Sequence, residues 1–340
     1  MRRPRLKAPE HFDHAIYHCV SRVVDRQLVL QEAEREQFIR LMRLYERLYG
    51  LQVITFCIMS NHFHILVNVP SRPAVLPDDD ALVKLVRETQ GDGPANNLAN
   101  WLGRWRDQGN HQAAEAERER WFRQMWNVSQ FMKVLKQRFS QWFNGRGPVR
   151  RRGTLWEDRF RSVLVEDGEA LHAMAAYIDL NPVRAAIVDD PKDYRWSGYG
   201  EACANDGLAR RGLWRAAQAS DPTRGRDFDT LAWYREQLFG RGSERHDMMG
   251  NVVRRGFTQE EIEAVRRNQG RLPRHEYVRL RVRYFTDGAI LGTKAFVENV
   301  FQARRAWFSA ARKTGARPLV GLDRSDGLRA ARALRVRPLG

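Results

Sequence analysis

Two adjacent β-branched segments, separated by only two polar residues, place the strongest constraint on how this chain folds. Residues 51–59 (LQVITFCIM) and 62–69 (HFHILVNV) are rich in Val, Ile and Phe, as strands are. Ser60 and Asn61 between them form the polar pair expected in a tight turn. Since so short a connection joins antiparallel neighbours, we predict a β-hairpin.

The segments around this hairpin alternate between strand and helix patterns. Apolar residues recur at intervals of three and four in the helical segments, while the strand segments are β-branched. The order strand, helix, hairpin, helix, strand, helix predicts an α+β fold, a ferredoxin-like split βαβ sandwich with helices on one face of an antiparallel sheet. The predicted elements flanking the hairpin are a strand at 15–24, a helix at 31–49, a helix from Ser129, as its cap, to Gly145, a strand at 162–166 and a helix from 169 through Tyr177.

Two parts of the chain lie outside this pattern. Residues 71–128 are polar and broken by Gly and Asn, which indicates a helical insertion. Beyond about residue 205 the pattern becomes mostly helical and the end is rich in Arg. We therefore expect one catalytic domain at 1–205, and a helical, basic accessory region with a disordered tail at 206–340.

The charge balance favours a polyanionic partner. Lys and Arg number 58 against 41 Asp and Glu, a formal net charge of +17, and nucleic acid is the commonest polyanion. With 43% apolar residues the chain can still bury a core. Three widely spaced cysteines argue against a disulfide framework, and no long apolar run is present, so we expect a cytoplasmic protein that does not enter a membrane.

A histidine pair in the second hairpin strand carries the first chemical signal. Successive strand side chains alternate between faces, so His62 and His64 project from the same side and Phe63 from the other. Two imidazoles then converge. Taken alone, the pair is more often two residues lining a half-buried sheet than a site.

A second signal lies in the segment AAYIDLNPVRAAIV at 175–188. Tyr177 and Asn181 are four residues apart, which on a helix places a phenol and a carboxamide on one face. The alternative is that Tyr177 packs in the core and Asn181 ends the helix, because Pro182 disfavours the helical state for the residue before it.

The chain resembles a known family in four blocks that occur in the same order. SNHFHILV and YIDLNPVRAAIV, flanked by YHCVSRV and RRGTLWEDRFRSVLVED, are similar to the single-tyrosine HUH transposases, most closely the REP-associated tyrosine transposase branch. The similarity covers about 12–70 and 129–200 of this chain. Two positions depart from the pattern: Ser60 stands where a proline is usual, and Ala186 where a glycine is usual.

The resemblance implies a reaction and a set of residues. His62 and His64 would bind a metal ion, Asn181 would be the third ligand, and Tyr177 would be the nucleophile. Three such ligands leave positions for water and phosphate on Mg²⁺ or Mn²⁺. The implied activity is that of a tyrosine transposase, a DNA nickase and strand transferase that forms a 5′-phosphotyrosine intermediate on single-stranded, hairpin-forming repeat DNA.

The segment before the last predicted strand combines basic and aromatic residues, as single-stranded DNA sites do. Within it, Trp142 and Phe143 fit a helix core better than a DNA surface. The residues we expect at the DNA are Arg150, Arg151, Arg152, Trp156, Arg159 and Arg161.

Two other classes of protein compete with this interpretation. A non-catalytic RNA- or DNA-binding module can use the same α+β sandwich, but it would carry aromatic pairs on strands that here carry histidines. A structural zinc protein would need a Cys and His spacing that the chain lacks. A transposase would be nucleoid-associated; the sequence leaves its oligomeric state open, a homodimer being one option.

Overall fold

The computed structural model describes residues 6–146, 153–225, 227–240, 245–246, 252–254, 284–319 and 327–331. The chain divides into two compact units. The first comprises Met1–Leu30, Val53–Val67 and Trp156–Gly340, and the second comprises Gln31–Gln52 and Asn68–Leu155. Segments far apart in the sequence therefore build each unit.

A mixed sheet forms the framework of the first unit. Its first four strands lie in the order β2-β3-β1-β4, which is the strand order of a ferredoxin-like split βαβ sheet. The main-chain N–H of Met59 donates to the carbonyl of His62 at 2.8 Å and closes the predicted hairpin. The α+β class and the predicted strand order are thereby confirmed. The four strands are β1 (His14–Arg22), β2 (Gln52–Ile58), β3 (His62–Pro70) and β4 (Arg161–Val165).

Three short strands from the last part of the chain extend this sheet beyond β4. β7 (Ile290–Gly292) pairs with β4 in parallel, β9 (Arg329–Ala331) pairs antiparallel with β7, and β8 (Arg317–Pro318) closes the edge. The sheet is thus not wholly antiparallel, and its unit crosses the boundary that we predicted near residue 205. Strands of two or three residues are too short to show a period of two, which is why the sequence did not reveal them.

Among the described residues after 205, four further α-helices are present. They are α9 (Gly207–Ser220), α10 (Thr230–Gly240), α12 (Tyr284–Asp287) and α13 (Lys294–Ala303). A small separate sheet is formed by β5 (Arg245–His246) and β6 (Val252–Arg254). Residues 320–326 and 332–340 of the predicted disordered tail lie outside the described residues.

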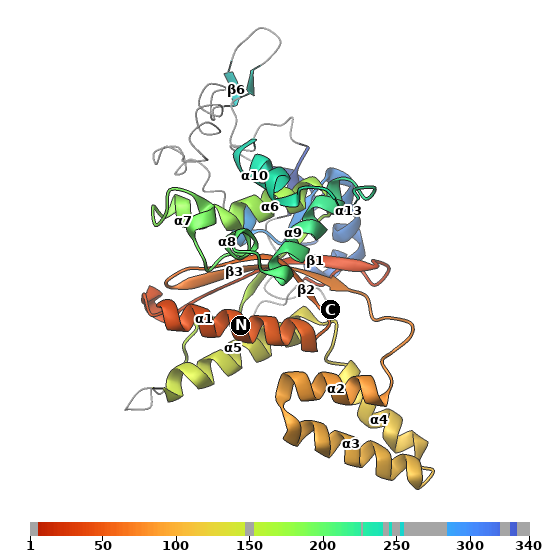
Figure 1. Cartoon of the computed structure of the whole chain (residues 1–340). Helices are drawn as coiled ribbons and strands as arrows, with labels where there is room; N and C mark the ends of the chain where they lie inside the picture. The colour runs from red at the N-terminus through yellow and green to blue at the C-terminus, as the bar shows by residue number, and fades with distance from the viewer. Residues whose placement is uncertain are drawn as a thin grey trace. The chain divides into compact units, whose positions relative to one another are not determined.

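Helices α6, α9 and α10 lie on one side of the sheet (Figure 1). The buried face of α6 (Glu169–Asp179) packs with Val163 and Val165 of β4 in one apolar core. Helix α9 approaches β2 so closely that a Cβ atom at Gly212 would meet the carbonyl oxygen of Ile54. Glycine is therefore required where this helix crosses the strand. The short α8 (Gly198–Cys203) completes this layer.

Two long helices organise the second unit. In α1 (Glu32–Leu48) and α5 (Val128–Gly145) the rings of Phe38 and Phe139 pack with their centroids 5.1 Å apart. The N-cap of α5 is Asn127, whose side chain accepts the main-chain N–H of Ser129 at 2.9 Å. Ser129 is thus the second helical residue and not the cap that we predicted, because the Asn two positions earlier satisfies the free N–H groups.

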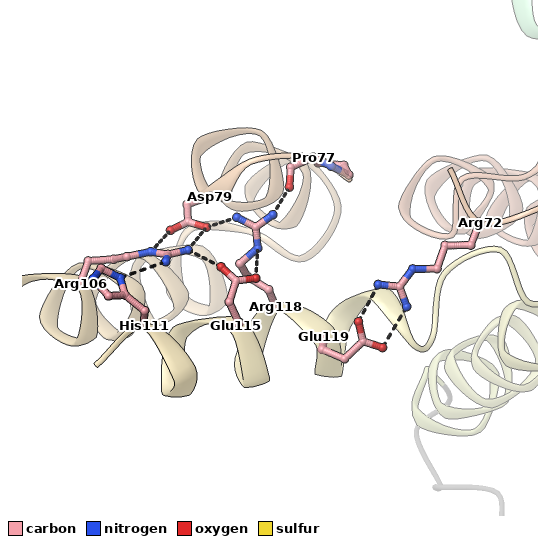
Figure 2. Close-up of polar contacts among 8 residues, drawn as sticks. All are labelled: Arg72, Pro77, Asp79, Arg106, His111, Glu115, Arg118 and Glu119. Atoms are coloured by element: carbon pink, nitrogen blue, oxygen red, sulfur yellow. Dashed lines mark hydrogen bonds and ion pairs between the residues drawn. The ribbon is translucent and has the colours of Figure 1, made fainter. Parts of the chain in front are cut away.

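The predicted insertion is a group of three helices in the second unit, α2 (Asp79–Gln90), α3 (Asp92–Asp107) and α4 (His111–Phe122). Figure 2 shows ion pairs within this part of the chain: Asp79 at the start of α2 accepts from both Arg106 of α3 and Arg118 of α4, and Arg72, which precedes α2, pairs with Glu119 at 2.6 Å. Opposite charges here neutralise one another within the insertion. Among the residues that the structure describes, no helix has the length and apolar character to cross a bilayer.

Candidate catalytic and metal site

His62 and His64 open β3 and lie on the same side of the sheet, as alternation along a strand requires. Their ring centroids are 5.0 Å apart. His64 is 2% exposed, whereas His62 is partly exposed and so marks the open side of the pair. Phe63 points to the opposite face, where its ring packs edge-on against Trp156 at 5.3 Å.

A third histidine, His18 of β1, lies beside this pair. Its Nε2 is 2.9 Å from Nδ1 of His64, and the two rings stack with centroids 5.1 Å apart. On its other side, His18 Nδ1 is 2.7 Å from the main-chain carbonyl of Phe285. The sequence had left His18 without a role, although strand alternation offered a signal, since β1 and β3 are neighbours and His18 shares its face.

Tyr177 of α6 reaches the same place from the helical layer. Its ring centroid lies 5.8 Å from that of His64 and 6.2 Å from that of His18. The guanidinium carbon of Arg184 stands 4.0 Å from the centre of the phenol ring, and the Arg184 side chain also donates to the Tyr177 carbonyl. The structure therefore brings together the three groups His62, His64 and Tyr177 that the sequence singled out.

Asn181 lies one turn after Tyr177, since the chain stays helical through it. Helix α6 ends at Asp179, Leu180 has helical torsion angles, and α7 (Asn181–Arg184) follows with Pro182 in its first turn. The Asn181 Nδ2 donates to the carbonyls of Tyr177 at 3.0 Å and Ile178 at 3.3 Å. The side-chain oxygen is then the atom that suits a hard cation.

The turn after α7 explains one departure from the family pattern. Ala186 has φ = +55°, in the left-handed region that favours glycine. Its N–H donates to the Val183 carbonyl at 2.9 Å, so it ends the helix as a C-terminal glycine does. The family's usual glycine at this position therefore fits the backbone of this chain better than alanine does.

Burial keeps the site histidines neutral at pH 7. It lowers the pKa of His18 and of His62 to about 4, and the charge of Arg22 at the end of β1 adds to this effect at His62. The pKa of His64 is held well below its usual value by burial first and then by its histidine neighbours. Neutral imidazoles are the form in which histidine binds a metal.

A hydrogen bond to the His62 ring decides which of its two nitrogen atoms keeps a lone pair for a metal ion. Asn61 Nδ2 donates to the Arg26 carbonyl at 3.1 Å, so its Oδ1 faces His62 Nδ1, 2.7 Å away. Because an amide oxygen only accepts, His62 Nδ1 carries the proton and Nε2 keeps its lone pair. Two imidazoles and a carboxamide oxygen are a donor set that fits a divalent ion. Among the described residues, no three His, Cys, Asp or Glu side chains form an alternative metal cluster.

A buried carboxylate anchors the helix that carries Tyr177. Asp179, fully buried, accepts hydrogen bonds from Thr55 Oγ1 at 2.9 Å, from the main-chain N–H of Tyr199 at 3.2 Å and from the Tyr234 hydroxyl at 2.5 Å. These donors come from β2, α8 and α10, so α6 is tied to three elements at once. Burial raises the pKa of Asp179 to about 7.

The residues predicted at the DNA have different positions. Arg150, Arg151 and Arg152 lie outside the described residues. Trp156 is only 6% exposed: its ring packs on Phe63, and its main chain forms an isolated β-bridge with Val23, just after β1. Arg159, just before β4, and Arg161, at its start, are both exposed.

Phe285 is the site residue that sequence reasoning missed completely. Its ring centroid is 4.7 Å from that of Tyr177, and its carbonyl faces His18. It belongs to α12, more than a hundred residues after α6, in a part of the chain that shares no pattern with the family. No local signal could have placed it here.

Comparisons with known proteins agree with the first part of this pattern. Residues 11–76, which include His18, His62 and His64, match the family model described as transposase, IS200 like. Comparison with curated proteins gives no match. A solved structure described as a REP-associated tyrosine transposase bound to a REP hairpin is 12% identical, with 57% of this chain and 84% of that chain covered and a TM-score of 0.35. The predicted resemblance is thus confirmed over one segment: residues 11–76 of this chain carry the sequence pattern of the IS200-like transposases.

Proposed function

We propose that this protein is a metal-dependent, single-stranded DNA endonuclease and strand transferase that acts as a transposase on hairpin-forming DNA. The activity would proceed through a 5′-phosphotyrosine intermediate on Tyr177. The proposal also places the protein at the nucleoid in the cytoplasm, and it leaves the oligomeric state open, with a homodimer as one option.

One observation carries the proposal. The ring of His64 lies 5.0 Å from that of His62 and 5.8 Å from that of Tyr177, both centroid to centroid, and His62 and Tyr177 are partly exposed. Asn181 stands one helical turn after Tyr177 on the same helical stretch. A purely structural histidine pair would not need a partly exposed tyrosine beside it. The transposase pattern over residues 11–76 supports the same conclusion.

The residues of the chain would divide the work of DNA cleavage. His62, His64 and Asn181 would hold Mg²⁺ or Mn²⁺. When bound, such an ion makes the phosphate a better electrophile and offsets charge on its oxygens. Tyr177 would attack phosphorus through its hydroxyl oxygen, so that a Tyr–O–P bond forms and the bond from phosphorus to the 3′ oxygen breaks.

Charge near Tyr177 suits this step. A phenol with a pKa near its usual value of about 10 is a weak nucleophile at neutral pH. The Arg184 guanidinium, 4.0 Å from the ring centre, would attract the phosphate to the phenol. The phenol proton leaves to solvent at this partly exposed side chain, and the departing 3′ oxygen takes up a proton.

The test is a search for the covalent adduct. Wild-type protein is incubated with Mn²⁺ and a hairpin-bearing single strand labelled at its 3′ end, and the products are separated on a denaturing gel. We expect a labelled protein band, because the fragment with the 5′ phosphate stays attached. Mass spectrometry should place the nucleotide on Tyr177.

The Tyr177→Phe variant should give neither cleavage nor adduct and should bind the DNA as the wild type does, since only one hydroxyl is lost. Tyr45→Phe, which removes a phenol hydroxyl in the second unit, is the matched control and should cut normally. Cleavage by Tyr177→Phe at the wild-type rate would refute the assignment. Cleavage that EDTA does not stop would refute the metal role of the histidine pair.

A further inference from the structure

A line of hydrogen bonds runs from the main chain of α12 through two histidines to the proposed metal site. It begins at the Phe285 carbonyl, which is 2.7 Å from His18 Nδ1, and continues from His18 Nε2 to His64 Nδ1 at 2.9 Å. Both rings are buried, with His18 0% and His64 2% exposed. Bulk water therefore has little access to these contacts.

The chemistry of the atoms decides which one donates and which one accepts in each of these hydrogen bonds. A carbonyl oxygen can only accept a hydrogen bond, so His18 Nδ1 carries a proton. In a neutral ring the other nitrogen, Nε2, is then an acceptor, and the atom facing it, His64 Nδ1, must be a donor. His64 Nε2 is thereby left with a lone pair.

We propose that His18 is a positioning residue that fixes His64 in the tautomer whose Nε2 is free to bind the metal, with the main-chain carbonyl of Phe285 setting that choice. This inference rests on the proposed metal site. It gives the two ligands matching arrangements, because Asn61 selects the same tautomer in His62. Partners of this kind orient metal-bound histidines in many sites and are usually carbonyl or carboxylate groups. Here a second imidazole relays the effect of the carbonyl.

The inference also gives a role to the late part of the chain. Phe285 contributes its carbonyl to the His18–His64 pair and its ring to Tyr177. Residues after 205 would then act on both the metal ligand and the nucleophile. An accessory region that only adds affinity for DNA would not do this.

The first measurement uses the metal-free, full-length protein labelled with ¹⁵N in its histidine rings. Long-range ¹H–¹⁵N spectra distinguish the two neutral tautomers, and the His64→Ala variant assigns the His64 signals. We expect a protonated Nδ1 and an unprotonated Nε2 for His64. A proton on Nε2 of His64 would overturn the inference, whatever the activity of the protein.

The second measurement follows Mn²⁺ binding by electron paramagnetic resonance. His18→Phe keeps a buried ring but removes both nitrogen atoms, and we expect the Kd for Mn²⁺ to rise about 10- to 100-fold, as for lost outer partners of other metal sites. His18→Gln can donate to the carbonyl and accept from His64, so it should restore most of the affinity. Unchanged affinity in His18→Phe would overturn the inference.

A reference variant separates this inference from the proposed function. If His64→Ala binds Mn²⁺ as tightly as the wild type, the proposed metal site fails, and the tautomer spectrum still tests the hydrogen-bond relay. If His64→Ala loses Mn²⁺ while His18→Phe keeps it, the site stands and the role of His18 is refuted. Circular dichroism of each variant confirms that it is folded.

Discussion

The Asp179 carboxyl should make the free energy of unfolding depend on pH, and the substitution Asp179→Asn should remove that dependence. Its ordinary pKa is 3.8, and burial raises it to about 7 in the folded chain. Between these two pH values the folded chain keeps a proton that the unfolded chain has released. The stabilisation is therefore complete below about pH 4 and is lost as the pH rises through about 7.

The size of the effect follows from the same two pKa values. Each tenfold change in proton affinity corresponds to about 1.4 kcal/mol, so the full range is about 4 kcal/mol. Integrated between about pH 5 and about pH 8, the loss in the free energy of unfolding is about 2–3 kcal/mol. Asp179→Asn cannot titrate and should lack this loss. It should also be less stable than the wild type at pH 5, because its amide NH₂ faces donors from Thr55 and Tyr234.

The assay is chemical denaturation at several pH values for the wild type and for Asp179→Asn, with the difference in unfolding free energy plotted against pH. Asp193→Asn, which changes an exposed carboxylate, is the control and should follow the wild type. A constant difference between wild type and Asp179→Asn across this range would refute the reasoning. It would mean that the three hydrogen bonds to Asp179 outweigh its burial.

Three further variants test the fold and the DNA surface. Gly212→Ala should destabilise the protein by about 1–3 kcal/mol and lower its melting temperature, because the added Cβ would meet the Ile54 carbonyl. An unchanged melting temperature would contradict the close approach of α9 to β2. Ala186→Gly should raise stability by about 1 kcal/mol in the same assay, because it relieves a left-handed backbone, and a loss would show that the turn is not strained. Replacing both Arg159 and Arg161 with Ala should make the slope of log affinity against log salt shallower by about 1.4 for single-stranded DNA, and an equal slope would exclude both from phosphate contact.

The parts of the fold that sequence predicted are those with local signals. The hairpin, α1 and α6 each carry a clear period or turn, and the histidine pair follows from strand alternation alone. His18 needed knowledge of which strands are neighbours. Phe285 and strand β7 meet partners more than a hundred residues earlier in the chain, which leaves no trace in a local window, and β8 and β9 are too short to show a period. The packing of Trp156 on Phe63 was not predicted, because an aromatic residue in a basic segment can equally well fill the far face of a sheet.

The parallel pairing of β4 with β7 has a consequence for the protein while it is being made. β4 ends at Val165 and β7 begins at Ile290, and at translation rates of about 5–20 residues per second the ribosome needs roughly 6–25 s to cover this interval. During that time β1 protects one edge of β4, while its other edge carries unpaired main-chain groups beside apolar side chains. Such an edge can pair with another nascent chain. Arrival of β7 ends this exposure, so chaperone demand during synthesis should be concentrated between these two strands.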